Sequence, residues 1–274
     1  MMRIVALLTV RNEELYLARC LEHLIANGVD VCVIDNGSTD ATPRIAAQFL
    51  GRGVIRTDTI PFTGAFAILP ILQNEERLAA EIDADWFMHH DADEIRESPY
   101  AGTTLAQAFE KAESEGYNAI NFDEFVFMPR GEHDRFEGLD YVREMRWYYF
   151  FCPKRQRRLN AWKRTDAPVD LCGSGGHRVQ FAGRRPYPID FIMRHYIALS
   201  WEHLARKYQS RRYSPEEIAD RSWHNDRARF DPSAARAADW SRMKELGAPG
   251  EWDRSDPWIE HPMFPLLRRR VPTS

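Results

Sequence analysis

The feature that most constrains this chain is the stretch of residues 85–94, whose first half is an apolar segment and whose end carries the acidic pattern Asp91-Ala92-Asp93. A run of this length and character suits a buried strand, whereas a protein core does not accept unpaired carboxylates. In an extended chain Asp91 and Asp93 point to the same side, with about 6–7 Å between their Cα atoms. Two carboxylates placed in this way suit a hard divalent cation such as Mg²⁺ or Mn²⁺.

The Asp-x-Asp pattern alone is weak, but the chain carries its own control in a second copy, Asp83-Ala84-Asp85. This copy precedes the apolar segment, where a loop between a helix and a strand is expected. Ligands of open α/β sheets bind outside the carboxyl ends of the strands. Position therefore favours Asp91 and Asp93 as a site, and it predicts an ordinary structural role for Asp83 and Asp85. Glu94 would point away from them and is expected to be structural.

Apolar runs of strand length alternate with amphipathic helical patterns through the first 125 residues. The runs predict strands at residues 3–9, 29–34 and 54–56 and in the first half of the stretch 85–94, with helices between them. Such alternation is typical of βαβ units and a parallel sheet. We therefore predict the α/β class, with a mostly parallel, Rossmann-like central sheet and flanking helices.

The pattern changes beyond residue 125, where the chain becomes rich in aromatic, Arg and Gly residues. Strand-like runs at residues 147–151, 179–181 and 191–195 predict a mixed-sheet extension over residues 126–200 of the same domain. Residues 201–274 are expected to form C-terminal helices and a tail. Capping signals predict two of these helices, one starting at Ser214 and a last one running from Asp231 to Gly247.

Composition excludes several classes of protein. The net charge of −4 gives no general attraction to nucleic acid or membrane. The four cysteines form no C-x-x-C pair, so a zinc site is not expected and a reducing compartment fits best. We see neither a signal peptide nor an apolar run long enough to span a bilayer, and expect a cytoplasmic protein. The basic segment 266–270 either contacts the inner face of a membrane or is a solvated tail.

Polar clusters follow three of the predicted strands: Arg11/Asn12/Glu13, Asp35/Asn36 and Asp91/Asp93. In a parallel sheet these clusters meet at one edge. Acids and amides there suit the base and ribose of a nucleotide. A cation suits its diphosphate, because charge develops on the diphosphate as it leaves.

The same segments resemble the GT-A fold glycosyltransferases of the family 2 type. The resemblance is carried by Val10-Arg11-Asn12-Glu13, by Val33-Ile34-Asp35-Asn36-Gly37-Ser38-Thr39-Asp40 and by His90-Asp91-Ala92-Asp93-Glu94, and it extends over residues 1–125. It implies a metal-dependent enzyme that uses Mn²⁺ or Mg²⁺. The enzyme would move a sugar from a UDP- or GDP-type nucleotide-diphospho-sugar to a glycan or lipid-linked acceptor, with inversion.

The resemblance also implies roles for individual residues. Residues 1–125 would be the donor-binding half and 126–200 the acceptor side. Thr9, Arg11, Asn12 and Glu13 would hold the nucleoside together with Asp35 and Asn36, Asp91 would contact ribose or sugar, and Asp93 would bind the metal. The family often has two acids where this chain has Asp35-Asn36, which leaves the identity of the base open.

Other candidates have a plain structural alternative. His177 and His195 would complete the metal shell or contact phosphates, or else are hydrogen-bonded core residues. Arg77 contacts base or phosphate, or is a helix-surface arginine. Asp170 is the preferred general base among four acids (Asp123, Glu124, Asp166 and Asp170), although any one of them is as readily a solvated loop acid. The basic stretch 154–164 holds an anion or is a charged exposed hairpin.

Two further functions compete with sugar transfer. A nucleotidyltransferase would use a related sheet, but that class usually has a Gly-rich loop after its first strand, and residues 10–13 contain no Gly. A non-catalytic nucleotide-sugar-binding module is favoured by the absence of an evident base motif.

Overall fold

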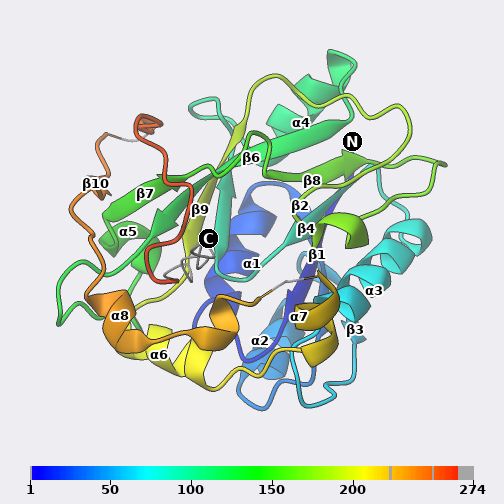
Figure 1. Ribbon diagram of the computed structural model, residues 1–274. Coiled ribbons are helices and arrows are strands. Elements are labelled where there is room, and N and C mark those ends of the chain that lie inside the picture. Colours follow the sequence, from blue (N-terminus) through cyan, green and yellow to red (C-terminus); the bar gives the residue numbers. More distant parts are fainter. Residues whose placement is uncertain (1, 222–223, 249, 265–274) are drawn as a thin grey trace, which may run out of the picture.

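The computed structural model describes residues 2–221, 224–248 and 250–264 (Figure 1). One sheet runs through the molecule, in the order β10-β7-β6-β8-β4-β1-β2-β3, while β9 pairs with both β5 and β6. The strands are β1 (Ile4–Val10), β2 (Val29–Asp35), β3 (Val54–Thr59), β4 (Trp86–His90), β5 (Glu94–Glu97), β6 (Ala119–Phe127), β7 (Trp147–Phe151), β8 (Arg158–Lys163), β9 (Phe191–Tyr196) and β10 (Lys244–Glu245). The helices are α1 (Leu17–Ala26), α2 (Thr42–Phe49), α3 (Ile68–Glu81), α4 (Leu105–Ser114), α5 (Tyr141–Glu144), α6 (Trp201–Gln209), α7 (Pro215–Arg221) and α8 (Pro232–Arg236), with short 3₁₀ turns η1 (Cys172–Ser174) and η2 (Arg227–Arg229).

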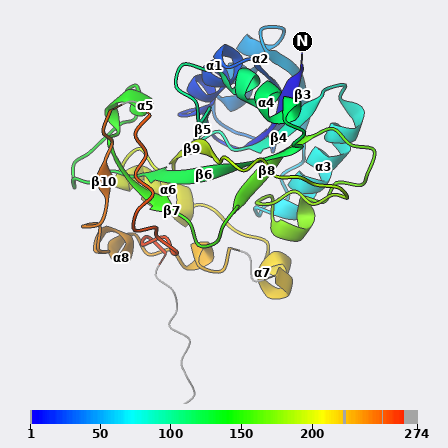
Figure 2. The same cartoon turned by 90° about the horizontal axis from the view of Figure 1, so that it is seen from above.

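The first half of the sheet is parallel, as predicted. β4, β1, β2 and β3 lie side by side in the same direction. The apolar side chains of β1, β2 and β4 are buried on both faces, which is why these three strands read as continuous apolar runs, whereas β3 lies at the edge and is only partly buried. Helices α1, α2 and α4 cover one face and α3 covers the other (Figure 2). The α/β class with flanking helices is therefore confirmed.

The second half is the mixed extension that the sequence predicts, although the strand expected at residues 179–181 is wrong, since only isolated bridges form at Arg178 and Gln180. β6 pairs antiparallel with β7 and β8 and parallel with β9. β8 was not predicted, and the charged hairpin considered for residues 154–164 is wrong for its second part. Arg158 to Trp162 are buried, because β8 is inserted between β4 and β6 in the middle of the sheet.

The C-terminal segments follow the sequence signals only in part. The helix expected from Asp231 to Gly247 is wrong, because α8 ends at Arg236. Trp240 folds back so that its indole N–H donates to the Ala235 carbonyl, and the chain then enters β10. Residues 250–264 pack irregularly against the extension, with Trp258 stacked on Tyr149. The basic segment 266–270 lies outside the described residues.

Two further expectations are settled by burial and pairing. Cys20 and Cys32 are buried core residues, and none of the cysteines is in a disulfide. At the amino end of β4 the Arg3 amide donates to Asp85, and Arg164 pairs with Asp83, so this Asp-x-Asp copy is structural. No helix among the described residues is long and apolar enough to cross a membrane.

Candidate active site

The carboxyl ends of β1, β2 and β4 meet at one edge of the sheet. Leu8 lies beside His90, and Val10 lies beside Asp35, in the parallel register. The three polar clusters therefore come together, as the sequence predicts. They form one wall of a cavity of about 1060 Å³. The opposite wall is formed by residues between Phe151 and Phe264, which come from β8, from α6 and from the segments after α6.

Asp91 and Asp93 belong to a turn, which corrects the expected extended geometry. β4 ends at His90, the Glu94 amide donates to the Asp91 carbonyl at 3.1 Å, and β5 starts at Glu94. Both acids line the cavity. Asp91 makes no ion pair with another described residue, and burial raises its pKa. Glu94 is buried and bound by Arg96 at 2.7 Å, which agrees with the expected structural role.

The wall after β1 and β2 is built around Arg11. Its guanidinium lies 3.3 Å from the centre of the Phe62 ring and donates to the carbonyls of Asn36 and Gly37. Gly37 has φ +65°, and a Cβ there would lie 3.1 Å from the Cβ of Phe62, so this turn needs glycine. Asn36 is buried and its Nδ2 donates to the Ile60 carbonyl at 3.1 Å. The result is a flat cation–aromatic surface with an amide beside it.

The other predicted nucleoside ligands serve the loops around this wall. The carboxylate of Asp35 accepts from the Ser38 amide, and Asp35 itself does not line the cavity. Asn12 has φ +55° and accepts from the Thr39 amide at 2.8 Å. Glu13 lines the cavity, and burial raises its pKa to about 7. The structure thus places Arg11, Asn12, Glu13 and Asn36 at the cavity, although Asn12 also braces its loop, and it leaves Asp35 with a loop contact alone.

A buried carboxylate that the sequence analysis missed stands behind Thr9. Glu75 of α3 is fully buried and accepts from the Thr9 hydroxyl at 2.9 Å and from His89 Nδ1 at 2.6 Å. Burial alone would lower the pKa of His89, but Glu75 raises it to about 9. Gly176 packs closely here, since a Cβ would lie 2.9 Å from His89 Nε2. Thr9 is therefore engaged in fixing β1 to α3.

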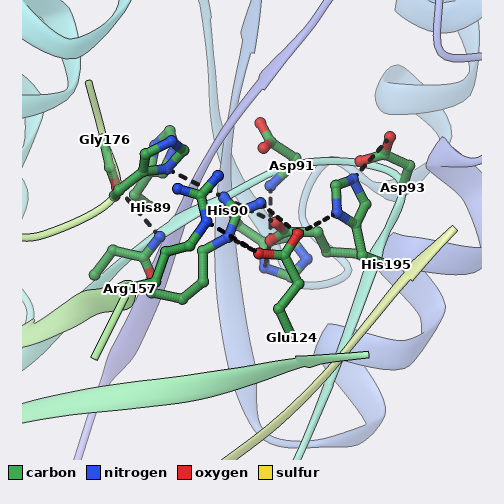
Figure 3. A network of polar contacts seen from close by, with 12 residues as sticks. His89, His90, Asp91, Asp93, Glu124, Arg157, Gly176 and His195 are labelled. Carbon is green, nitrogen blue, oxygen red and sulfur yellow. Dashed lines mark hydrogen bonds and ion pairs between the residues drawn. The ribbon is translucent and has the colours of Figure 1, made fainter. Parts of the chain in front are cut away.

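A chain of alternating charges runs beneath the cavity (Figure 3). Arg158 binds Glu124 through two nitrogens at 2.8 Å each, and His195 Nδ1 donates to Glu124 at 2.7 Å. His195 Nε2 lies 3.6 Å from Asp93 Oδ2, and Lys207 Nζ lies 2.7 Å from the same oxygen. Although burial alone would lower the pKa of His195, Asp93 and Glu124 raise it to about 10. His195 is thus a charged bridge between two carboxylates.

The remaining predicted residues are dispersed. His177 lines the cavity, and burial together with Arg157 and Arg158 holds its pKa well below the usual range. Arg77 is exposed on α3, paired with Glu81 and Asp58, and does not line the cavity. Asp170 is also exposed and outside the cavity, where its carboxylate accepts from the Gly173 amide at 2.7 Å.

The cavity also contains cations that the sequence analysis did not single out: Lys207 and Arg211 come from α6 and the turn after it, and Arg227 from η2. Arg157, just before β8, belongs to the basic stretch 154–164 that the sequence analysis did name as a possible anion site. Arg157 has a buried Nε without a hydrogen-bond partner among the described residues, and burial lowers its pKa to about 10. Arg227 has no ion pair within the described part of the chain. The one available sequence signal was the density of Arg after residue 200.

The fit of a divalent cation can be tested on the residues themselves. Asp93 Oδ2 is already bound by the Lys207 ammonium, and His195 is charged and engaged with Glu124. Among the residues that the structure describes, no three His, Cys, Asp or Glu side chains are grouped to hold a metal ion. In this arrangement the residues do not fit a divalent cation at Asp93, and metal dependence stays a prediction.

The comparisons with known proteins agree with the resemblance seen in the sequence. Residues 6–59, which span β1 to β3, match the family model described as glycosyl transferase family 2. The match confirms the resemblance to GT-A, family 2 type glycosyltransferases in the segment that forms the cavity wall. A search of curated proteins found no match.

Solved structures give weaker likenesses. S. aureus TarS is similar with a TM-score of 0.46 and 11% identity, covering 72% of this chain and 37% of TarS. S. aureus TarS 1–349 in complex with UDP has a TM-score of 0.47 and 11% sequence identity. The match covers 82% of this chain and 75% of that one. Glucosyl-3-phosphoglycerate synthase from Mycobacterium tuberculosis, in complex with Mn²⁺, UDP and phosphoglyceric acid, has a TM-score of 0.30 and 20% sequence identity. The match covers 46% of this chain and 43% of that one. The chain thus spans little more than a third of full TarS, and we base the function on the family match and the cavity.

Proposed function

We propose that the protein is a glycosyltransferase that moves a sugar from a nucleotide-diphospho-sugar to an acceptor hydroxyl. One observation carries this proposal: the carboxyl ends of β1, β2 and β4 converge on a cavity of about 1060 Å³, and β1 and β2 belong to the segment that matches the family. A cavity of this size suits a nucleotide-sugar with room for part of an acceptor.

The donor's nucleoside would lie along the wall formed by Arg11, Phe62 and Asn36. The Arg11–Phe62 pair offers a flat face for stacking of the base, and Asn36 offers an amide at its edge. The diphosphate would then extend toward Asp91 and the cations on the opposite wall. Preorganised cations at this position stabilise the charge that develops on the leaving diphosphate.

The acceptor would enter from the side formed by the segments after residue 150. A glycan or a lipid-linked acceptor and inversion of the anomeric centre are what the family resemblance favours. Inversion needs a general base on the acceptor hydroxyl. Asp170 does not line the cavity, so the acids that do line it, such as Asp91 and Glu13, are better placed for this step. The cytoplasmic location and any contact with a membrane stay predictions from the sequence.

The proposal is tested by incubating the protein with a panel of UDP- and GDP-sugars and measuring release of the nucleoside diphosphate. We expect slow release without an acceptor from at least one donor, loss of release in Asp91→Asn, and unchanged release in Asp83→Asn. Asp83 is a matched control, because it lies in the other Asp-x-Asp copy at the far end of β4.

Two results would contradict the proposal. Pyrophosphate release from a nucleoside triphosphate would indicate a nucleotidyltransferase. A non-catalytic binding module would be indicated if the protein binds a nucleotide-sugar but releases no nucleoside diphosphate, whichever acceptor is added.

A further inference from the structure

Lys207 reaches from α6 to the acid that the sequence pattern marks as the metal ligand. Its ammonium donates to Asp93 Oδ2 at 2.7 Å and to the Ile197 carbonyl at 3.2 Å. Both charged side chains are only 11% exposed. The packed surroundings of a buried ion pair keep both side chains in one rotamer. The side chains of an exposed pair exchange between rotamers, and such a pair contributes little to stability.

The position of Lys207 is fixed by the packing of α6. Ser200 caps the helix by accepting from the His203 amide, and Trp201, Leu204 and Tyr208 are buried against the extension of the sheet. With these residues anchored, Lys207 faces the cavity, with its Nζ 5.6 Å from the centre of the Tyr16 ring. The packing of α6 therefore both forms part of the cavity wall and places the Lys207 ammonium at Asp93.

A divalent ion bound to Asp93 would have to share that carboxylate with a fixed ammonium and with the His195 imidazole 3.6 Å away. Like charges a few ångströms apart in a partly buried site repel strongly. Two of the three Lys207 N–H groups are already used by Asp93 and Ile197, which leaves one donor for a ligand. Lysine is a well-suited point charge for phosphate.

Other cations line the same cavity. Arg211 follows α6 directly and lies 4.0 Å from Glu13 on the opposite wall. Among the described residues, the lining contains eight Arg or Lys and seven Asp or Glu residues, so a diphosphate would be held by individual cations such as Lys207 and Arg211 and not by a large excess of positive charge.

We propose that Lys207 takes the place of the divalent cation, so that the cavity binds a nucleoside diphosphate group through Lys207 and Arg211 without a metal ion. Asp93 then orients the ammonium and does not ligate a metal. This inference rests on the proposed function, since it concerns how the same cavity holds its donor.

The first test uses Mn²⁺ alone, followed by electron paramagnetic resonance. We expect the wild-type protein to bind Mn²⁺ weakly, and Lys207→Met to bind it about tenfold or more tightly, because removing the ammonium frees Asp93 beside Asp91. Lys207→Arg keeps the charge and should behave as wild type. Adding Asp93→Asn to Lys207→Met should abolish the gain. Wild-type affinity for Mn²⁺ equal to that of Lys207→Met would overturn the inference.

The second test compares two conditions on the wild-type protein before it turns to a variant. Binding of UDP and GDP to the wild-type protein is measured by calorimetry in EDTA and in Mn²⁺. We expect equal affinity in both for the nucleotide that binds, and about tenfold weaker binding in Lys207→Met. Lys111→Met is the matched control, since Lys111 pairs with Glu115 on the surface of α4, away from the cavity.

The outcomes separate the two proposals. Nucleotide binding that requires Mn²⁺ overturns the role of Lys207 and leaves the glycosyltransferase standing. Absence of nucleotide binding in both EDTA and Mn²⁺ contradicts the glycosyltransferase itself, and the metal-free site falls with it.

Discussion

Asn36 keeps an acceptor oxygen available at the wall of the cavity. Its Nδ2 donates to the Ile60 carbonyl, while Oδ1 forms no hydrogen bond with another described residue. An acceptor at this place can receive the N3–H of uracil or the N1–H of guanine, but it meets a lone pair at N3 of cytosine. The departure from two acids at positions 35 and 36 therefore does not remove the function that an acid would have here.

Replacing Asn36 with Ala should weaken binding of the preferred nucleotide by about tenfold, because one hydrogen bond to the base is lost. The preference for uridine or guanosine over cytidine diphosphate should fall with it. Calorimetry measures both effects. Asn118→Ala is the matched control, since this amide also binds backbone groups but lies outside the cavity. Equal nucleotide affinity in wild type and Asn36→Ala would show that the base does not contact this wall.

Lys207 and Asp170 show what residue patterns alone can and cannot predict. Asp91, Asp93 and Asn36 follow strand ends directly, so local sequence places them at the cavity. Lys207 reaches Asp93 only because α6 packs over the sheet, and no local pattern encodes that contact. Asp170 has the right chemistry for a base, but its loop holds it outside.

The helix α6 carries a histidine that resists protonation. His203 Nδ1 accepts from the Leu199 amide at 3.2 Å, which requires the neutral ring. Burial, together with Lys207, lowers the pKa of His203 from 6.5 to about 4. Because the folded pKa is the lower one, the unfolded chain binds more protons between pH 6.5 and 4, and the free energy of unfolding falls as the pH is lowered through that window.

We expect His203→Asn to reduce this acid sensitivity, because the amide oxygen can still accept from Leu199 but does not titrate. Between pH 7 and pH 5 the wild-type protein should lose about 1–2 kcal/mol more stability than the variant. Urea unfolding at the two pH values measures the difference. His133→Asn, in an exposed loop, should leave the acid sensitivity unchanged. The same loss in wild type and His203→Asn would contradict a buried neutral ring.

At the level of elements, strands buried on both faces were the easiest to predict and inserted strands the hardest. β1, β2 and β4 are continuous apolar runs, so their sequence identifies them. β8 contains Arg158 and Asn160, whose polar groups are satisfied by Glu124 and the Gly176 carbonyl far along the chain. Because the sequence alone does not show these partners, the charged and polar residues of β8 predict an exposed segment. α8 ends early for a similar reason, since the contacts of Trp240 are tertiary.

The whole molecule joins a predictable half to an unpredictable one. The parallel half, with three polar strand ends at one edge, follows from alternation and strand direction. The mixed half contributes the second wall of the cavity through segments that lie far apart along the chain, from Arg158 in β8 to His261. Residues after position 200 therefore complete the cavity, although the family match lies entirely within residues 6–59.

A crystal structure of the protein with UDP or GDP, whichever binds more tightly, tests the central claim most directly. We predict the base against Arg11 and Phe62 with its edge at Asn36, and the diphosphate within hydrogen-bond distance of Lys207. A nucleotide bound elsewhere, or a base on the wall formed by the segments after residue 150, would contradict the assignment of the three strand ends as the donor site.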